Sequence, residues 1–307
     1  MSEAVHVAVP RKGRPLEAVL DRIASRDAVE TPPGHPSFAD VADDVVSTLR
    51  YEKAVTKGEQ TADRDVYERL GAYSDLSDPY RPDFTLLRDD RAGKPPRVVF
   101  DSLTVSVAGT DVHLVGREEP FRSLRTHEFP LGFDSADLVL EEVVTLRPEP
   151  LERIADLNAR IDPHDTDVRV VAGLGDTVYH TLLATPEARE RVDADLTRSF
   201  VAAYEGAVCI SPRYERLVEA VLGTAATEGV EFTYPPEDRE EEAAIADAGV
   251  GVYLTMTGST AREHGLVLGE RLFPSETVLL ENRTECGDRA RRVRDGLAAD
   301  VETALSL

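Results

Sequence analysis

The sequence has no tryptophan, only two cysteines, and no apolar run long enough to cross a bilayer. Cys209 and Cys286 lie far apart and fit neither a zinc pattern nor a disulfide framework, so we expect both to be small core residues. The seven histidines lack the spacing of metal ligands, and His113, between apolar neighbours, is expected in a strand. No signal peptide opens the chain, so we expect a cytoplasmic protein. From the spacing of the cysteines and histidines we expect no metal held by protein ligands.

Positive charge is scarce, and lysine is the scarcest source of it. Four lysines and 31 arginines face 58 acidic residues, which gives a formal net charge of -23. Such a field repels nucleic acids and anionic membranes, so neither is expected as a partner. The acidic residues are spread along the chain, which is typical of a halophilic protein, because at molar salt the Debye length is about 3 Å and self-repulsion costs little. The acidity therefore describes the solvent rather than the substrate.

Apolar runs and helical periodicities alternate along the 307 residues. Strands are predicted at residues 5–9, 97–100, 112–115, 136–140, 168–171, 207–210, 250–254 and 277–281. Helices are predicted at residues 16–25, 41–57, 64–73, 187–205, 214–228 and 289–307. This alternation favours an α/β fold with a largely parallel sheet in each of two domains.

The chain divides into two predicted lobes. We expect a first α/β lobe over residues 1–150, interrupted by a polar insertion at 32–96 whose short helices wrap its surface. A second α/β lobe, with a candidate phosphate loop, is expected over residues 151–267. The late strand must pack against other strands, so residues 268–307 are expected to return and complete the first lobe. This organisation predicts two strand crossovers and a hinge.

The segment YLTMTGSTAREHGL, residues 253–266, predicts a buried strand, a tight turn and the start of a helix. The turn consists of Thr257, Gly258, Ser259 and Thr260. A glycine lets backbone amides approach a ligand, hydroxyls add donors, and the positive end of a helix dipole favours an anion. In an ordinary turn, the alternative, the hydroxyls would only cap the helix. The pattern indicates a phosphorylated small molecule as ligand.

A second candidate anion site lies near the start of the chain. The apolar run HVAVP is followed by Arg11, Lys12, Gly13 and Arg14 and then by an amphipathic helical pattern. Cations and amides would then lie at the carboxyl edge of a strand, where open α/β sheets bind ligands. The alternative is a solvated basic turn. We expect this turn and the Thr-Gly-Ser-Thr turn to converge on one anion-sized space.

A third turn, Gly173 to Thr177, follows a predicted strand and is expected to open a helix. Its glycines are compatible with a second anion nest. A plain strand-to-helix turn with Asp176 as the cap is the favoured interpretation.

Three separated stretches carry a family pattern. VAVPRKGRPLEAVLDRI contains a strand and a Lys-Gly-Arg turn, TDVHLVGREE is followed by LGFDSADLVL, and LTMTGSTAREHGL is followed by ETVLLENRTE. Together they resemble the first strand, the middle strands and the phosphate loop of the ATP phosphoribosyltransferase of histidine biosynthesis. The resemblance spans roughly half the chain. It implies a two-lobed fold similar to the type 2 periplasmic binding proteins, with mostly parallel sheets and insertions.

That resemblance also implies an activity and a set of roles. The family joins phosphoribosyl pyrophosphate to ATP with magnesium as cofactor. Thr257, Gly258, Ser259 and Thr260 would hold the 5-phosphate, Lys12, Gly13 and Arg14 would face the pyrophosphate or the nucleotide, and Glu240 matches a family glutamate. Short forms of the family work with a partner subunit, so a homo-oligomer or a partner regulatory subunit is implied.

Two positions depart from the family. Aspartates usually stand eight and four residues before the first threonine of the loop, where this chain has Gly249 and Tyr253. Asp247 could replace the first after a small slip. Carboxylates in such a strand serve ribose hydroxyls and magnesium, which favour anionic oxygen. Their replacement supports an alternative hypothesis, a non-catalytic small-molecule-binding or regulatory paralogue that kept the phosphate loop.

Overall fold

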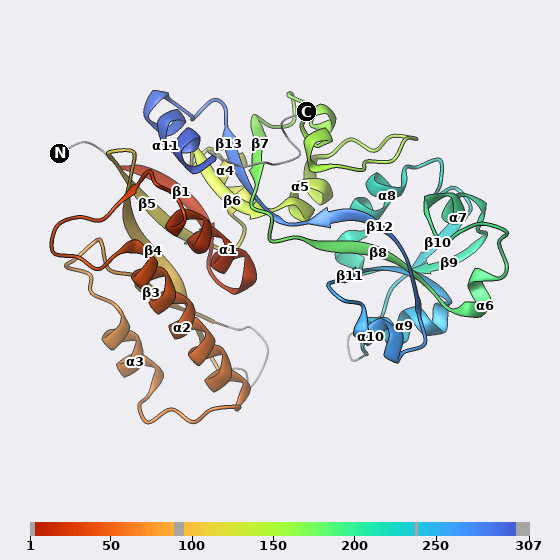
Figure 1. Cartoon of the computed structure of the whole chain (residues 1–307), viewed down its shortest axis with the longest axis horizontal. Helices are drawn as coiled ribbons and strands as arrows, with labels where there is room; N and C mark the ends of the chain where they lie inside the picture. The colour runs from red at the N-terminus through yellow and green to blue at the C-terminus, as the bar shows by residue number, and fades with distance from the viewer. Residues whose placement is uncertain (1–3, 89–94, 237–238, 299–307) are drawn as a thin grey trace. The chain divides into compact units, whose positions relative to one another are not determined.

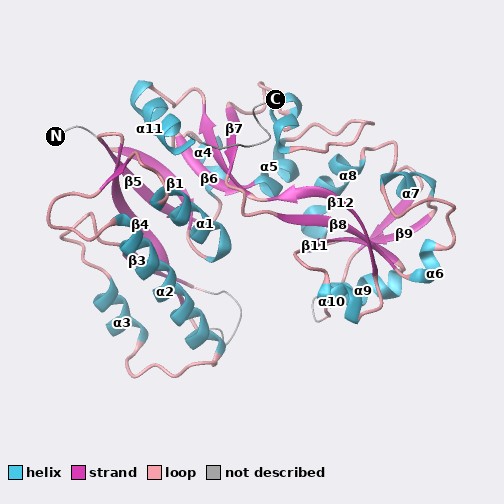
Figure 2. Cartoon of the chain, in the orientation of Figure 1, coloured by secondary structure: helices cyan, strands magenta, loops and turns pink. Residues whose placement is uncertain are grey.

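A computed structural model describes residues 4–88, 95–236 and 239–298 (Figure 1). The described chain forms two compact units, each a sheet with helices (Figure 2), so the α/β class is confirmed. The first unit contains residues 4–134, 167–174 and 277–298, and the second contains residues 135–166 and 175–276. The boundaries between the units therefore fall after residues 134, 166, 174 and 276, rather than after 150 and 267.

The first unit is built on an eight-stranded sheet. Its strands are β1 (Val5–Pro10), β2 (Val29–Glu30), β3 (Asp83–Leu87), β4 (Arg97–Val107), β5 (Thr110–Arg117), β6 (Leu131–Ser135), β7 (Val168–Gly173) and β13 (Thr277–Asn282). They lie in the order β2-β4-β5-β1-β6-β13-β7, with β3 also paired to β4. β1 is parallel to β5 and β6, whereas β4 is antiparallel to β2, β3 and β5. The parallel pairs therefore surround β1.

Helices α1 (Gly13–Ala24), α2 (Phe38–Lys57), α3 (Val66–Tyr73), α4 (Pro120–Arg125) and α11 (Asp288–Ala298) accompany this sheet. α1 buries Leu16, Val19, Leu20 and Ile23, whose spacing of three and four residues places them on one helix face. That face packs into a core with Val7, Val9 and other sheet residues. Because α1 follows β1 at once, its first turn is fixed at the carboxyl end of a central strand.

The second unit has a five-stranded sheet in the order β10-β9-β11-β8-β12. Its strands are β8 (Val178–Ala184), β9 (Gly206–Cys209), β10 (Val230–Thr233), β11 (Val250–Thr255) and β12 (Val267–Ser275). β9 is parallel to β10 and β11, and β8 is antiparallel to β11 and β12. Its helices are α5 (Ala136–Val143), α6 (Pro186–Arg189), α7 (Arg198–Ala203), α8 (Glu215–Leu222), α9 (Glu241–Ala248) and α10 (Ser259–Glu263), with 3₁₀ turns at Ile154–Asp156, Asn158–Arg160 and Pro212–Tyr214.

Both sheets repeat one order of strands. In each sheet, three adjacent strands are arranged so that the earliest of them in the chain lies between the other two. These strands are β5-β1-β6 in the first unit and β10-β9-β11 in the second. The fourth place is taken by a strand that arrives from the other unit, β13 in the first and β8 in the second. β8 follows β7 directly, and β13 follows β12 directly. At these two points the chain passes from one unit to the other through a strand-to-strand connection.

The two connections are hydrogen bonded at short range. Thr177 Oγ1 donates to Glu276 Oε2 at 2.6 Å, and Leu174 N donates to Thr277 O at 2.9 Å. The turn from Gly173 to Thr177 therefore leads into β8, and the prediction that it opens a helix capped by Asp176 is wrong. The turn connects two strands because the chain passes between sheets here, which a local pattern does not encode.

Replacing Glu276 by glutamine should stabilise the protein at neutral pH. Burial raises the pKa of this carboxyl, although hydrogen bonds from Thr177 and Gly175 lower it in part. The folded state therefore holds the proton more tightly than the unfolded state, so the wild type loses stability as pH rises above the ordinary glutamate range. Thermal unfolding of both proteins should show a gap that closes in acid, where Glu276 is protonated in both states; a gap constant with pH would contradict this.

Several sequence predictions differ from the observed elements. The run at 136–140, predicted as a strand, is helix α5, capped by Ser135 and buried at Ala136, Val139 and Leu140. The helix predicted over 187–205 is split into α6 and α7, because Leu196 in between accepts a hydrogen bond from Glu270 N in β12.

Two further differences concern where elements end. The helix predicted over 214–228 ends as α8 at Leu222, since Gly223 takes φ 84°. The insertion 32–96 contains helices as predicted, but its end also adds β3 to the first sheet. In the described ranges, no helix combines the length and apolar character that a membrane span requires.

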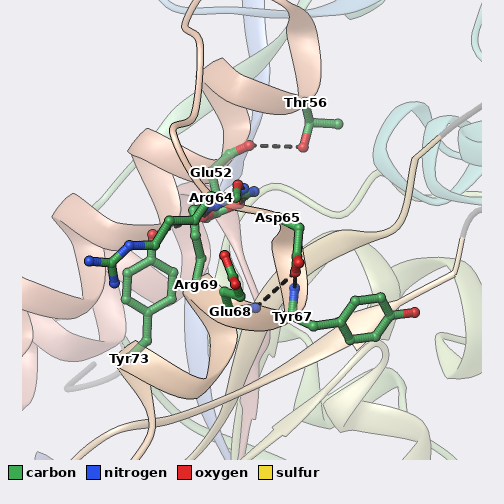
Figure 3. Close-up of polar contacts among 8 residues, drawn as sticks. All are labelled: Glu52, Thr56, Arg64, Asp65, Tyr67, Glu68, Arg69 and Tyr73. Atoms are coloured by element: carbon green, nitrogen blue, oxygen red, sulfur yellow. Dashed lines mark hydrogen bonds and ion pairs between the residues drawn. The ribbon is translucent and has the colours of Figure 1, made fainter.

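Glu52 joins helix α3 to helix α2 (Figure 3). Its carboxylate accepts hydrogen bonds from Arg69 Nε at 2.7 Å, Arg69 Nη2 at 2.9 Å and the Tyr73 hydroxyl at 2.9 Å. Glu52 is 2% exposed. The hydrogen bond to Glu52 raises the pKa of Arg69, while burial and the same carboxylate raise the pKa of Tyr73 to about 12. Within the insertion, α3 is therefore fixed to α2 by a buried, fully paired charge.

Candidate functional site

The Thr-Gly-Ser-Thr turn has the predicted strand, turn and helix geometry. β11 ends at Thr255, Gly258 adopts φ 69°, and Ser259 opens α10. A Cβ at Gly258 would overlap the side chain of Leu268. Glycine is thus required twice, by a left-handed backbone and by close packing against β12.

The exposed part of this turn gathers hydroxyl and amide donors. Thr257 Oγ1 lies 3.1 Å from Ser259 Oγ and 3.4 Å from Ser259 N, and Arg262 Nη2 donates to Thr257 O at 2.8 Å. Thr257, Ser259 and Thr260 are all exposed. α10 has only five residues, so a helix dipole contributes little, and affinity for an anion would rest on the local donors and on Arg262.

The strand beneath the turn is held in place by a buried hydroxyl pair. Thr181 Oγ1 of β8 lies 2.6 Å from Thr255 Oγ1, the last residue of β11, and both side chains are buried. Tyr179 and Thr255 are also partners in the antiparallel ladder. The turn therefore leaves a rigid strand end, as a preorganised ligand loop requires.

The two positions that depart from the family have definite structural roles. Gly249 has φ 94°, ends α9, and its carbonyl accepts a hydrogen bond from Thr185 N at 2.8 Å. Asp247 is exposed and forms an ion pair with Arg239, so it does not replace a carboxylate in the strand. Tyr253 is half-buried; burial, and then a hydrogen bond to Glu241, raise its pKa.

Two carboxylates at the start of α9 lie in this part of the second unit. Glu240 precedes the helix, is exposed, and has its Oε2 at 3.1 Å from His264 Nε2, just beyond α10. Glu241, the first residue of α9, pairs with Tyr253. Sequence reasoning singled out Glu240 and missed Glu241, because no local signal shows that α9 begins beside β11.

The basic turn after β1 is attached to two neighbouring strands. Phe100 N of β4 donates to Arg11 O at 3.0 Å, and Arg11 Nε donates to Gly116 O of β5 at 2.9 Å. Gly13 then takes φ 75° and opens α1, as its lack of a Cβ allows. Lys12 Nζ lies 3.0 Å from Glu118 Oε2. Arg11 thus anchors the turn.

The basic turn lines a cavity within the first unit. Lys12, Gly13 and Arg14 share it with residues of α2 and β4, and its volume is about 740 Å³. That volume is in the range of small-molecule sites, which is about 300–1,000 Å³. The structure therefore brings Lys12, Gly13 and Arg14 to one cavity, and it places Thr257, Gly258, Ser259 and Thr260 in one exposed turn of the second unit.

A magnesium ion held by protein carboxylates does not fit the candidate site. Among the described residues, no group of three His, Cys, Asp or Glu side chains is placed to hold a metal ion. At the family's aspartate positions, Gly249 has no side chain and Tyr253 offers a phenol, whereas magnesium prefers anionic oxygen.

Comparison with known proteins identifies the family. The whole chain, residues 1–307, matches HisG_halo, the halobacterial ATP phosphoribosyltransferase family. Among curated proteins, none matches the sequence. Similar solved structures include the ATP phosphoribosyl transferase (HisG:HisZ) complex from Thermotoga maritima, with 12% identity, 95% of this chain and 98% of that chain covered, and a TM-score of 0.40. Another is the BvgS periplasmic VFT2 domain of Bordetella pertussis, with 11% identity, coverage of 64% and 74%, and a TM-score of 0.33.

The family match spans the full length of the chain. The chain therefore belongs to the halobacterial ATP phosphoribosyltransferase family.

Proposed function

We propose that this protein binds phosphoribosyl pyrophosphate and a purine nucleotide and transfers the phosphoribosyl group to a ring nitrogen of the purine. The observation that carries the proposal is the exposed Thr257–Thr260 turn, built on a required glycine, in a chain whose whole length matches the family. Its amides and hydroxyls would hold the 5-phosphate.

The proposed reaction depends on placement and charge. The bond from the ribose C1 carbon to the pyrophosphate oxygen breaks and its electron pair leaves with pyrophosphate, while a purine ring nitrogen supplies the pair for the new bond. Lys12 and Arg14 are proposed to stabilise the charge that develops on the leaving group. A purine ring nitrogen is itself nucleophilic, so the proposal requires no general base.

Magnesium is proposed only as a companion of the ligand's phosphates. Magnesium commonly binds substrate phosphate oxygens and keeps several waters, with few protein ligands. This role is compatible with the absence of a carboxylate group of three among the described residues.

The second candidate function is a non-catalytic binding or regulatory protein. Gly249 and Tyr253, which stand where the family has aspartates, favour it. We also propose a cytoplasmic location. We further propose that the protein forms either a homo-oligomer or a complex with a regulatory subunit. Sedimentation of the purified chain and of cell extract would distinguish these two assemblies.

Titration calorimetry with phosphoribosyl pyrophosphate, with and without magnesium, tests the two functions when it is combined with an assay of pyrophosphate release in the presence of ATP. Magnesium-dependent binding with release supports the transferase. Binding without release supports the regulatory protein. Absence of binding both with and without magnesium contradicts both functions.

Substituting Lys12 by alanine should weaken binding of the polyphosphate-bearing ligand about tenfold at low salt, since a charge-assisted hydrogen bond contributes about 1.5–3 kcal/mol. The effect should shrink in molar salt, where exposed charges are screened. Glu118→Gln is the matched control. It removes the carboxylate 3.0 Å from Lys12 and should raise affinity under the same conditions. Equal affinities of wild type and Lys12→Ala at low salt would exclude the basic turn as a ligand site.

A further inference from the structure

We propose that α2, which belongs to the insertion, forms the cationic wall of a polyphosphate subsite in the first unit. Lys53 and Lys57 of α2, together with Arg97 at the start of β4, would bind the phosphate chain of the nucleotide. This inference rests on the proposed function for the identity of the ligand, but its geometry stands on the cavity alone.

The cavity is unusually cationic for this chain. Of its lining residues, two are acidic and six are basic, namely Lys12, Arg14, Arg50, Lys53, Lys57 and Arg97. The chain as a whole has 58 acidic and 35 basic residues. Three of its four lysines lie in this cavity. A protein that carries a net charge of -23 thus concentrates its scarce lysine on one concave surface, where it would attract an anion.

The two acidic residues of the cavity are already neutralised by arginines. Glu17 Oε2 lies 2.6 Å from Arg50 Nη2. Glu52 is buried and accepts two hydrogen bonds from Arg69. Their charges are therefore not available to balance Lys53 and Lys57.

Lys53 and Arg97 retain donors for a ligand. Lys53 is exposed and forms no ion pair or hydrogen bond with any residue in the described ranges. Arg97 Nε is buried and has no hydrogen-bond partner among the same residues. A buried donor without a partner costs about 1–3 kcal/mol, which an anion at this position would remove.

Helix stability does not explain the position of Lys53. Lys53 and Lys57 are four residues apart on one face, and like charges at this spacing cost about 0.2–0.5 kcal/mol. Lys57, in the last turn of α2, interacts favourably with the helix dipole and lies 3.6 Å from Glu59. Neither account applies to Lys53, which lies one turn earlier, or to Arg97, which lies on a different element.

The spacing and the volume indicate the chemistry of the ligand. Lys53 and Lys57 are one helical turn apart, about 5–6 Å, so successive phosphates of a chain can each meet one cation. The cavity, about 740 Å³, has room for more than one phosphate. The group that fits this subsite is a diphosphate or triphosphate. The nucleotide and phosphoribosyl pyrophosphate are the two ligands that carry such a group.

The test compares two double variants of the full-length chain. Lys53→Ala/Lys57→Ala removes the α2 lysines, and Arg291→Ala/Arg292→Ala removes two exposed cations from α11 of the same unit, with the same change in net charge. Calorimetry at low salt would use inorganic tripolyphosphate, ATP, AMP and phosphoribosyl pyrophosphate. Thermal unfolding of both variants would show whether each is folded.

We expect the α2 variant to bind tripolyphosphate and ATP at least about tenfold more weakly than the α11 variant, with a smaller change for AMP, because each lost lysine removes a charge-assisted contact. Weakening of phosphoribosyl pyrophosphate instead of ATP would support the subsite and assign it to the other source. Equal affinities of the two variants for every ligand would overturn the inference. Tripolyphosphate binding does not depend on turnover, so a failed transferase assay would contradict the proposed function and leave this result intact.

Discussion

Replacing Gly258 by valine should abolish binding of phosphoribosyl pyrophosphate to the second unit. The residue has φ 69°, which an L-residue adopts at a cost of about 1–2 kcal/mol and a β-branched one at a higher cost. Its Cβ would also overlap Leu268. The turn would shift, and the amides and hydroxyls of Thr257 and Ser259 would no longer face one phosphate.

The design of the experiment must separate the loss of the ligand from the loss of the fold. The overlap involves the end of a flexible side chain, so we expect Gly258→Val to destabilise the unit by about 1–3 kcal/mol without unfolding it. Leu268→Ala is the matched control, because it alters the packing beneath the turn and leaves the backbone of Gly258 unchanged. Gly258→Ala/Leu268→Ala then retains the strained backbone without the overlap. Calorimetry on the folded proteins should show that, of the three variants, only Leu268→Ala binds phosphoribosyl pyrophosphate. Retained affinity in Gly258→Val would mean that the loop is not the site.

The parts of the fold that depend on local patterns could be predicted. The Thr-Gly-Ser-Thr turn and the basic turn each combine an apolar strand with a glycine that must have positive φ, so the sequence within a few residues determines the geometry. The return of β13 to the first sheet also followed from a strand that had no other partner in sequence.

The remaining features depend on residues far apart in the chain. The five-residue run at 136–140 is compatible with a strand or a helix, and burial of α5 in the second unit decides for a helix. The pairing of Glu241 with Tyr253 requires α9 to begin beside the end of β11. The cationic wall could not be predicted either, since Lys53 and Arg97 are 44 positions apart and meet only because α2 packs on β4.

Glu52→Ala should destabilise the protein by about 3–5 kcal/mol, because it removes one partner of a buried ion pair and leaves the other charge uncompensated. The Arg69 side chain is 12% exposed and donates two hydrogen bonds to this carboxylate. The Tyr73 hydroxyl loses its acceptor as well. α3 has no fully buried residue of its own and packs on the core through partly buried Val66, Leu70 and Tyr73, so Glu52 supplies its buried polar attachment to α2.

Chemical denaturation of Glu52→Ala and Glu52→Gln would measure this contribution. Glutamine keeps the side-chain volume and one acceptor, so it should lose less than alanine, and the difference between the two reports the packing and the remaining hydrogen bond. Arg153→Ala is the control, because Arg153 pairs with Asp156 on the surface, where such pairs contribute about 0–1 kcal/mol. Because Glu52 also lines the cationic cavity, detachment of α3 should loosen α2 and weaken tripolyphosphate binding in Glu52→Ala. If Glu52→Ala were as stable as the control, the buried pair would not hold α3 to α2, and the rigidity of the cationic wall would need another source.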